Sequence, residues 1–195
     1  SGCVLLDCVL GGGWAEGRMV NIVGDKSTGK TLLAIEACAN FAKQHPDGDI
    51  FYCEVEAAFS PEYAEGLGFP VSRVTFIEEC RTVEDLFEDL QKKLEKCSKP
   101  TLYIVDSLDA LSDRAEQERE IDKGTFGANK AKIVGQLFRR LVALMEEKNL
   151  TLFIISQERD NIGVMFGKTT TRSGGRALDF YASQIIWLSQ IKTHK

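Results

Sequence analysis

Two features are missing from this sequence, the ligand pattern of a zinc site and an apolar stretch long enough to span a membrane. It has only two histidines, and its six cysteines never form a C-x-x-C pair, so it lacks the ligand spacing of a zinc site. No apolar stretch reaches the roughly 18 residues that a membrane-spanning helix needs, and we expect no signal peptide before the domain. We therefore expect a cytoplasmic protein in which Cys38 and Cys53 are buried, reduced thiols.

The chain also lacks an excess of basic residues. Its formal net charge is −5, so it has no general positive field, and any contact with nucleic acid must come from a local patch. The 195 residues, 44% of them hydrophobic, are enough for one α/β domain with a full core. We do not expect a second full domain.

What the sequence does contain is a phosphate loop. Residues 24–31, GDKSTGKT, match the Walker A pattern GxxxxGK[ST] and lie between an apolar run, 19–23, and a helical run that begins at Leu32. A strand, a glycine-rich turn and a helix N-terminus direct backbone N–H groups and the helix dipole at one point, which suits a triphosphate. Lys30 would reach the β- and γ-phosphates of ATP, and the Thr31 hydroxyl would bind Mg²⁺. The alternative is a glycine-rich turn without nucleotide. The residues expected to hold the nucleotide here are Gly24, Asp25, Lys26, Ser27, Thr28, Gly29, Lys30, Thr31 and Leu32.

Acidic residues close two further strands. The apolar run 102–105 ends at Asp106, which is the Walker B pattern, and Asp106 would hold Mg²⁺ through a water beside Thr31. A helix cap or a turn residue is the alternative role for Asp106. The strand 50–55 ends in Glu54-Val55-Glu56, which places carboxylates at the carboxyl edge of a parallel sheet, where ligands bind.

Strand and helix patterns alternate along the chain. We expect strands at 19–23, 50–55, 71–77, 102–107, 150–156 and 183–188, helices at 32–44, 61–67, 83–96 and 132–148, and a loop over 1–17. This alternation predicts an α/β fold with a mostly parallel central sheet and helices on both faces.

Two long connections have an unusual composition. The segments 112–131 and 158–176 mix Arg and Lys with exposed apolar residues and glycines, and Phe126 and Ile162 lie within them. Cations for phosphates and apolar side chains for bases are what a single-stranded nucleic acid site needs. The alternative is a lid or a partner-docking loop.

Five segments together resemble one known family. They are GDKSTGKT (24–31), EVEAAFSPEYA (54–64), VDSLDAL (105–111), IGVMFG (162–167) and SGGRALDFYAS (173–183). In this order they resemble the core ATPase domain of RecA-family recombinases, bacterial or phage type, over nearly the whole chain. The last two segments are more specific than a Walker motif. The resemblance implies a RecA-like phosphate-loop NTPase fold that binds ATP with Mg²⁺.

The resemblance also implies roles for single residues at the ATP site. Glu56 matches the catalytic glutamate that orients the attacking water. Gln157 matches the glutamine that senses the γ-phosphate and passes the state of the nucleotide to the second of the family's two DNA-binding loops. Lys30 is the third residue of this expected catalytic set. Tyr63 matches the aromatic that stacks on adenine, and Ser60 stands where an aspartate commonly contacts the base. The alternatives are a sheet-edge carboxylate for Glu56 and an ordinary polar strand end for Gln157.

The two long connections match the family's two DNA loops, whose apolar residues insert between base triplets. Arg139 is similar to a DNA-contacting arginine, although a solvated surface charge is equally compatible with its position. Phe180 matches an aromatic that couples neighbouring subunits, with a plain core Phe as the alternative. The residues expected to contact DNA are Phe126, Arg139, Arg159, Ile162, Arg172, Ser173, Gly174, Gly175 and Arg176.

The sequence departs from the family pattern in several places. The family's N-terminal oligomerisation segment and its C-terminal part, with two lysines that reach the neighbouring subunit's triphosphate, are expected to be absent. Asp179 replaces a residue that is often basic, and Ala57 replaces a histidine. We expect a single ATPase core over 1–195, an excised core or a minimal phage-type relative, that hydrolyses ATP weakly and forms a weakened filament.

The resemblance favours one function over several alternatives. We expect a recombinase core, a DNA-dependent ATPase for recombination and repair, in which ATP switches two loops that bind single-stranded DNA. The alternatives are a minimal single-strand annealing protein, a ring-forming helicase or clock-type ATPase, and a non-enzymatic ATP-binding accessory protein. A ring predicts closed hexamers, an accessory protein predicts no DNA affinity, and a recombinase predicts helical assembly on DNA.

Overall fold

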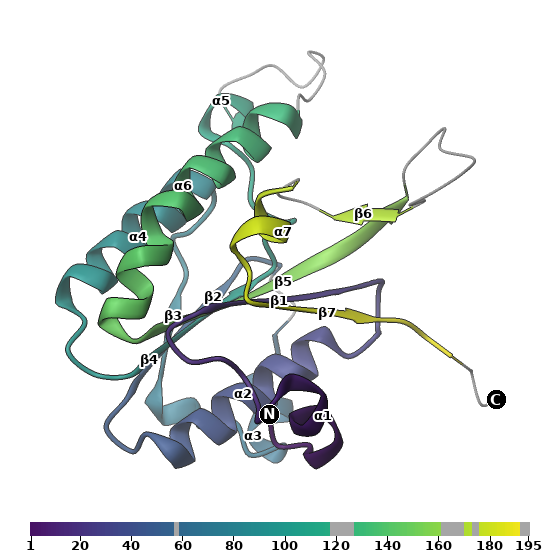
Figure 1. Ribbon diagram of the computed structural model, residues 1–195, viewed down its shortest axis with the longest axis vertical. Coiled ribbons are helices and arrows are strands. Elements are labelled where there is room, and N and C mark those ends of the chain that lie inside the picture. The colour runs from purple at the N-terminus through teal and green to yellow at the C-terminus, as the bar shows by residue number, and fades with distance from the viewer. Residues whose placement is uncertain (57–58, 118–126, 161–169, 173–175, 192–195) are drawn as a thin grey trace.

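A parallel sheet forms the centre of the molecule. The computed structural model describes residues 1–56, 59–117, 127–160, 170–172 and 176–191. Within these ranges six strands are parallel in the order β3-β2-β4-β5-β1-β7, and β6 pairs with β5 in antiparallel orientation (Figure 1). The strands are β1 (Met19–Gly24), β2 (Asp49–Glu54), β3 (Val74–Ile77), β4 (Thr101–Asp106), β5 (Leu150–Asp160), β6 (Thr170–Arg172) and β7 (Gln184–Leu188).

Helices cover both faces of this sheet, as the alternating pattern predicts. The helices are α1 (Val4–Leu10), α2 (Lys30–Gln44), α3 (Pro61–Gly66), the 3₁₀ turn η1 (Val71–Arg73), α4 (Val83–Lys96), α5 (Arg114–Gln117), α6 (Gly127–Lys148) and α7 (Ala177–Tyr181). In Figure 1, α4, α6 and α7 lie on one side of the sheet, and α1, α2 and α3 lie on the other. The predicted α/β fold class is therefore confirmed.

The apolar runs of the central strands arise because both faces of the sheet are covered. Side chains of a strand alternate between faces, and in β4 Tyr103 and Val105 join the core under α4 and α6. Leu102 and Ile104 join the second core, under α2. Every residue of β1 and β4 is buried. A continuous apolar run is thus the expected signature of these strands.

Helix α4 has a complete capping box at its start. The Thr82 side chain accepts the Asp85 N–H at 3.1 Å, and the Asp85 carboxylate accepts the Thr82 N–H at 3.0 Å. The Arg114 guanidinium donates to the same carboxylate at 2.8 Å. This pattern satisfies two N–H groups that the helix leaves unpaired, and it fixes where α4 begins.

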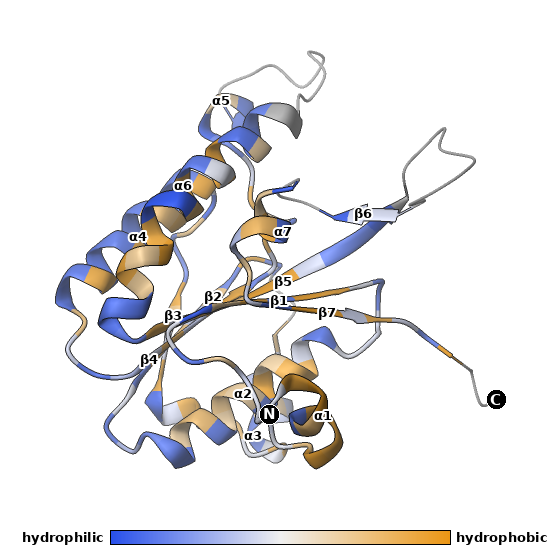
Figure 2. Ribbon diagram, in the orientation of Figure 1, coloured by the Kyte–Doolittle hydropathy of each residue, from blue (hydrophilic) through white to orange (hydrophobic). Residues whose placement is uncertain are grey.

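The prediction of a loop over 1–17 was wrong, because α1 occupies Val4–Leu10. No side chain of α1 is buried, and Val4, Leu5 and Val9 are 76%, 79% and 81% exposed. In Figure 2 most of α1 has the orange of hydrophobic residues. The helix ends at Gly11, whose φ of 75° is left-handed. A helix without a buried face carries no apolar periodicity that a sequence pattern can detect.

Three element boundaries differ from the prediction by more than two residues. The expected strand 71–77 begins with η1, and only Val74–Ile77 is strand. Helix α6 begins at Gly127 rather than at residue 132. Strand β5 continues past Ser156 to Asp160, because β6 pairs with its last residues, Glu158 to Asp160. Within the described ranges, no helix combines the length and hydropathy of a membrane span.

We expect Leu90→Ala to lower the free energy of unfolding by about 2–5 kcal/mol, because it leaves a cavity under α4. Leu90 is fully buried there. The matched control is Leu5→Ala on α1, where the side chain is exposed and the change should stay within about 0.5 kcal/mol. Urea denaturation measures both. Equal losses in the two variants would contradict the packing described.

Acidification should remove the contribution of the Asp85 carboxylate to the free energy of unfolding. Burial raises the pKa of Asp85, but hydrogen bonds from Arg114 and Thr82 outweigh burial and lower this pKa to about 2. An unfolded Asp titrates near about 3.9, so the stabilisation is present above that pH and is lost as pH falls toward 2. Urea denaturation from pH 6 to 2 should show the stability difference between wild type and Asp85→Asn shrinking over that window. A difference that stays constant would contradict the lowered pKa.

Candidate functional site

The phosphate loop connects β1 to α2 and is closed on itself by Asp25. The Asp25 carbonyl oxygen accepts the Thr28 hydroxyl at 2.8 Å and the Lys30 ammonium at 2.7 Å. Ser27 and Gly29 have positive φ values of 59° and 96°, and α2 begins directly after Gly29. The loop therefore presents the N-terminus of α2, with the Lys30 ammonium lying back across it.

Gly24 is required by close approach at the start of this loop. A Cβ atom at position 24 would lie 2.5 Å from the Thr28 hydroxyl oxygen and 2.9 Å from the Leu188 carbonyl oxygen of the neighbouring strand β7. Both distances are shorter than real contacts allow. The first glycine of the motif thus lets the loop lie against the end of β7.

Asp106 ends β4 beside the loop and accepts two hydroxyl groups. Thr31 Oγ1 and Tyr52 OH each donate to Asp106 Oδ2 at 2.9 Å, and Asp106 is only 8% exposed. Burial raises the pKa of Asp106, while the hydrogen bonds from Tyr52 and Thr31 lower it. A hydroxyl and a carboxylate in contact are a hard oxygen donor pair that fits Mg²⁺. Thr31 and Asp106, predicted as metal residues, are thus brought together.

Glu56 and Gln157 meet although they are far apart in the sequence. Gln157 Nε2 donates to Glu56 Oε1 at 2.8 Å, and the Ser107 hydroxyl donates to the same oxygen. The sheet register causes this meeting, because Gln157 pairs with Gly24 and Asp106 pairs with Glu54. The ends of four strands therefore place the phosphate loop, Glu56 and Gln157 along one edge.

Three residues of this site escaped the sequence analysis. Tyr52 and Ser107 hold Asp106 and Glu56, and the Asp109 carboxylate accepts the Gln157 N–H at 2.7 Å. Tyr52 could have been found because its hydroxyl lies within an apolar strand, where a buried Tyr needs a hydrogen-bond acceptor. Ser107 and Asp109 follow the Walker B strand directly, but no spacing rule shows where their side chains point.

The residues expected at the base lie at the start of α3. The Ser60 side chain caps α3 by accepting the Tyr63 N–H at 3.3 Å. Tyr63 is 66% exposed and Leu32 is 44% exposed. Tyr63 therefore has a free face for stacking, while the Ser60 hydroxyl is engaged by its own helix.

The predicted DNA-contacting residues occupy different environments. Arg159 and Arg176 are exposed, and Arg139 is exposed on α6 with its Nε 3.4 Å from the Tyr181 hydroxyl. Arg172 is 6% exposed and donates to Asp179 at 2.5 Å, so its guanidinium faces the protein. Phe126, Ile162, Ser173, Gly174 and Gly175 lie outside the described residues.

Phe180 is also exposed, by 77%, so the alternative of a plain core Phe was wrong. It lies on α7, next to the Asp179 carboxylate that pairs with Arg172. A large apolar side chain in this position is available to another molecule.

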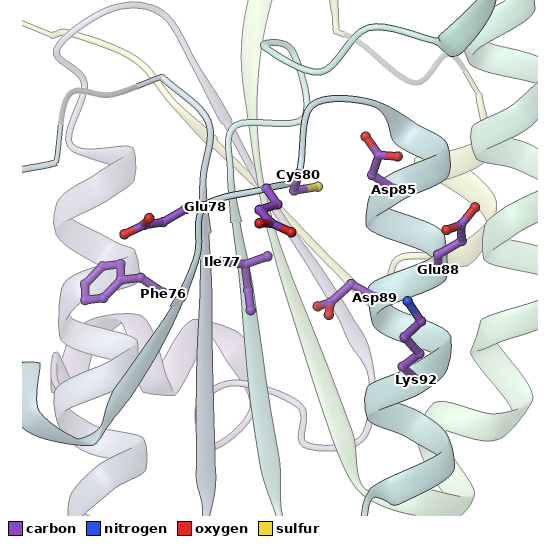
Figure 3. Close-up of a pocket in the computed structure, with 9 residues that line it drawn as sticks. Phe76, Ile77, Glu78, Cys80, Asp85, Glu88, Asp89 and Lys92 are labelled. Carbon is purple, nitrogen blue, oxygen red and sulfur yellow. The ribbon is translucent and has the colours of Figure 1, made fainter.

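A separate hollow of about 490 Å³ lies between the end of β3 and α4 (Figure 3). Its charged lining is mainly acidic and consists of Glu78, Glu79, Asp85, Glu88 and Asp89, with Lys92 as the basic residue. Carboxylates repel a triphosphate. This hollow is therefore unsuited to ATP, in contrast to the phosphate loop.

Known proteins resemble this chain over its whole length. The family model of the RecA N-terminal domain matches residues 1–195. A protein RecA of Streptomyces venezuelae is 35% identical over 196 residues, covering 100% of this chain and 50% of the relative. A protein RecA of Nocardioides sp. is 35% identical over 100% of this chain and 55% of the relative, and one of Treponema denticola is 35% identical over 99% of this chain and 46% of the relative.

The chain thus spans about half the length of the curated relatives it matches. Its match to the family covers the phosphate loop, the Walker B strand and β5 with Gln157. The chain belongs to the RecA family.

Proposed function

We propose that this chain is the ATPase core of a RecA-type recombinase, which binds single-stranded DNA under the control of ATP. The observation that carries the proposal is the hydrogen bond between Gln157 and Glu56, 2.8 Å long. It connects the carboxylate that we propose activates water, Glu56, with β5, the strand that leads into the second long connection. Family membership supports the same function.

The phosphate loop residues would hold ATP. The N–H groups at the start of α2 face the phosphates, and Lys30 exchanges the Asp25 carbonyl for a phosphate oxygen. Thr31 and Asp106 would hold Mg²⁺, which neutralises charge on the β- and γ-phosphates. Tyr63 offers its exposed ring to the adenine.

Glu56 acts on the attacking water. Its side chain is exposed to solvent, and the hydrogen bonds from Ser107 and Gln157 fix Oε1, so the other carboxylate oxygen can accept a proton from water. Gln157 detects the γ-phosphate because any movement of its side chain toward the nucleotide releases Glu56. The state of the nucleotide is thereby communicated to β5.

Exposed arginines near the end of β5, directly before α7 and on α6 supply local positive charge for DNA. Arg159, Arg176 and Arg139 contact backbone phosphates in this proposal, together with Ser173, Gly174 and Gly175. Phe126 and Ile162 separate the bases. The buried Arg172 guanidinium pairs with the half-exposed Asp179 carboxylate, and this contact gives Arg172 a structural part, holding β6 against α7. Backbone contacts of this kind carry little base preference.

A second copy of the chain completes the active unit. Phe180 is 77% exposed on α7 and offers an apolar contact to a neighbouring subunit in a helical filament. ATP would then lie at the subunit interface, and binding on DNA would be cooperative.

The DNA affinity should depend on nucleotide. Fluorescence anisotropy of a labelled single-stranded oligonucleotide should show binding that needs Mg²⁺ and a non-hydrolysable ATP analogue and weakens as salt rises. Lys30→Ala should abolish the dependence on nucleotide, because the phosphates lose their cation. Arg176→Ala should weaken binding and lower its salt sensitivity. Wild-type protein that binds no DNA in any nucleotide state would overturn the proposed function.

Replacing the proposed base should stop hydrolysis and spare binding. We expect Glu56→Gln to lower the single-turnover rate of ATP hydrolysis about 10²- to 10⁴-fold, with unchanged affinity for ATP, because Gln has the same shape but accepts protons poorly. The control is Glu95→Gln on the exposed face of α4, which should hydrolyse ATP at the wild-type rate. A Glu56→Gln variant of wild-type activity would exclude Glu56 as the base.

A further inference from the structure

The turn after β4 carries one buried carboxylate that contacts two residues of β5. Asp109 Oδ2 accepts the Gln157 N–H at 2.7 Å, and Asp109 Oδ1 lies 3.0 Å from the Arg159 guanidinium. The Asp109 side chain is only 3% exposed, while that of Arg159 is 56% exposed. One carboxylate thus joins a proposed γ-phosphate sensor to a proposed DNA-binding residue.

This contact replaces a missing strand partner. The pairing of β4 with β5 ends at Ile154, although β5 continues to Asp160. Beyond that point the turn after β4 supplies the hydrogen bonds to β5. The Leu108 N–H donates to the Ile155 carbonyl at 3.0 Å, and the Asp109 carboxylate accepts the Gln157 N–H, the next N–H of β5 that points toward the turn. The position of the Gln157 backbone on this side of β5 therefore depends on Asp109.

A second element holds the turn itself. Lys130, near the start of α6, donates from Nζ to the carbonyl oxygens of Leu108 at 2.8 Å and Asp109 at 3.4 Å, and to that of Leu111. These bonds fix the backbone from which the Asp109 carboxylate projects. The carboxylate therefore has little freedom to follow Arg159 if the arginine moves.

We propose that Asp109 is a positioning residue that couples ATP hydrolysis to DNA binding. It holds Gln157 against Glu56, and it competes with DNA phosphates for the Arg159 guanidinium. This inference rests on the proposed function. A guanidinium forms the same charge-assisted bonds with a carboxylate and with a phosphate, so a DNA strand that captures Arg159 removes one of the two groups that Asp109 binds.

The coupling works in both directions. A nucleotide that draws Gln157 toward the phosphate loop strains its bond to Asp109 and makes Arg159 easier to capture. DNA that captures Arg159 draws the end of β5 away from the fixed Asp109 carboxylate, which weakens the hydrogen bond from the Gln157 N–H. Linkage requires that both effects have the same size.

Asp109→Asn separates the two contacts. Asn keeps a carbonyl oxygen for the Gln157 N–H, but it has no charge to hold Arg159. We expect the affinity for single-stranded DNA without nucleotide to rise about twofold to fivefold, as the loss of a partly exposed ion pair allows. The ratio of affinities with and without ATP analogue should fall, while the affinity for ATP stays unchanged. Asp109→Ala should in addition lower the rate of hydrolysis, because Gln157 loses its acceptor.

Removing any negative charge near DNA also raises affinity, so a charge-matched control is needed. Glu158→Gln makes the same change one residue from Arg159, on the opposite face of the strand, and Glu158 forms no ion pair with Arg159 in the described structure. We expect a smaller effect from Glu158→Gln that persists in an Arg159→Ala background. The effect of Asp109→Asn should vanish in that background.

Anisotropy with the same labelled oligonucleotide at fixed salt measures all variants, and thermal unfolding confirms that each is folded. Asp109→Ser, which is smaller and keeps an acceptor, repeats the test if Asp109→Asn fails to fold. Wild-type affinity and nucleotide dependence in Asp109→Asn and Asp109→Ser would overturn the inference. An effect of Asp109→Asn on DNA affinity that keeps its full size in the Arg159→Ala background would also overturn it. In both cases wild type still binds DNA. Failure of wild type itself to bind would instead overturn the proposed function.

Discussion

The parallel register of β1, β2, β4 and β5 is the constraint on which the site depends. It places Gly24 beside Gln157 in adjacent strands, and Glu54 beside Asp106. Because the carboxyl ends of parallel strands meet at one edge, the phosphate loop, the metal pair and the base need no long-range arrangement of their own. A slip of one residue in any of these strands would turn the site residues to the wrong face.

Hydrogen bonds connect this edge into one chain of contacts. Ser107 follows Asp106 directly and donates to Glu56, Glu56 accepts from Gln157, and Gln157 donates to Asp109. A hydrogen bond to a charged group such as a carboxylate contributes about 1.5–3 kcal/mol, and coupling between two sites of a protein is typically about 1–3 kcal/mol. The loss of one such bond is therefore enough to account for a switch. Larger movements are not required by the energetics.

The sequence predicted the parts of this site that are contiguous. The phosphate loop, the strand before Asp106 and the helix patterns were found because each has a local spacing rule. Helix α1 was missed because it buries no face, and the extension of β5 was missed because β6 pairs with it from a distance. The engagement of Ser60 with α3 and the burial of Arg172 against Asp179 arise from tertiary contacts that a residue type does not reveal. Asp109 escaped for the same reason.

The central claim is that the nucleotide changes the far end of β5. Amide hydrogen exchange followed by mass spectrometry, with and without Mg²⁺ and a non-hydrolysable ATP analogue, tests this claim most directly. We expect slower exchange in the phosphate loop together with altered exchange in residues 155–160, and loss of both changes in Lys30→Ala. Slower exchange in the phosphate loop with no change in residues 155–160 would contradict the coupling of Gln157 and Asp109 to the nucleotide.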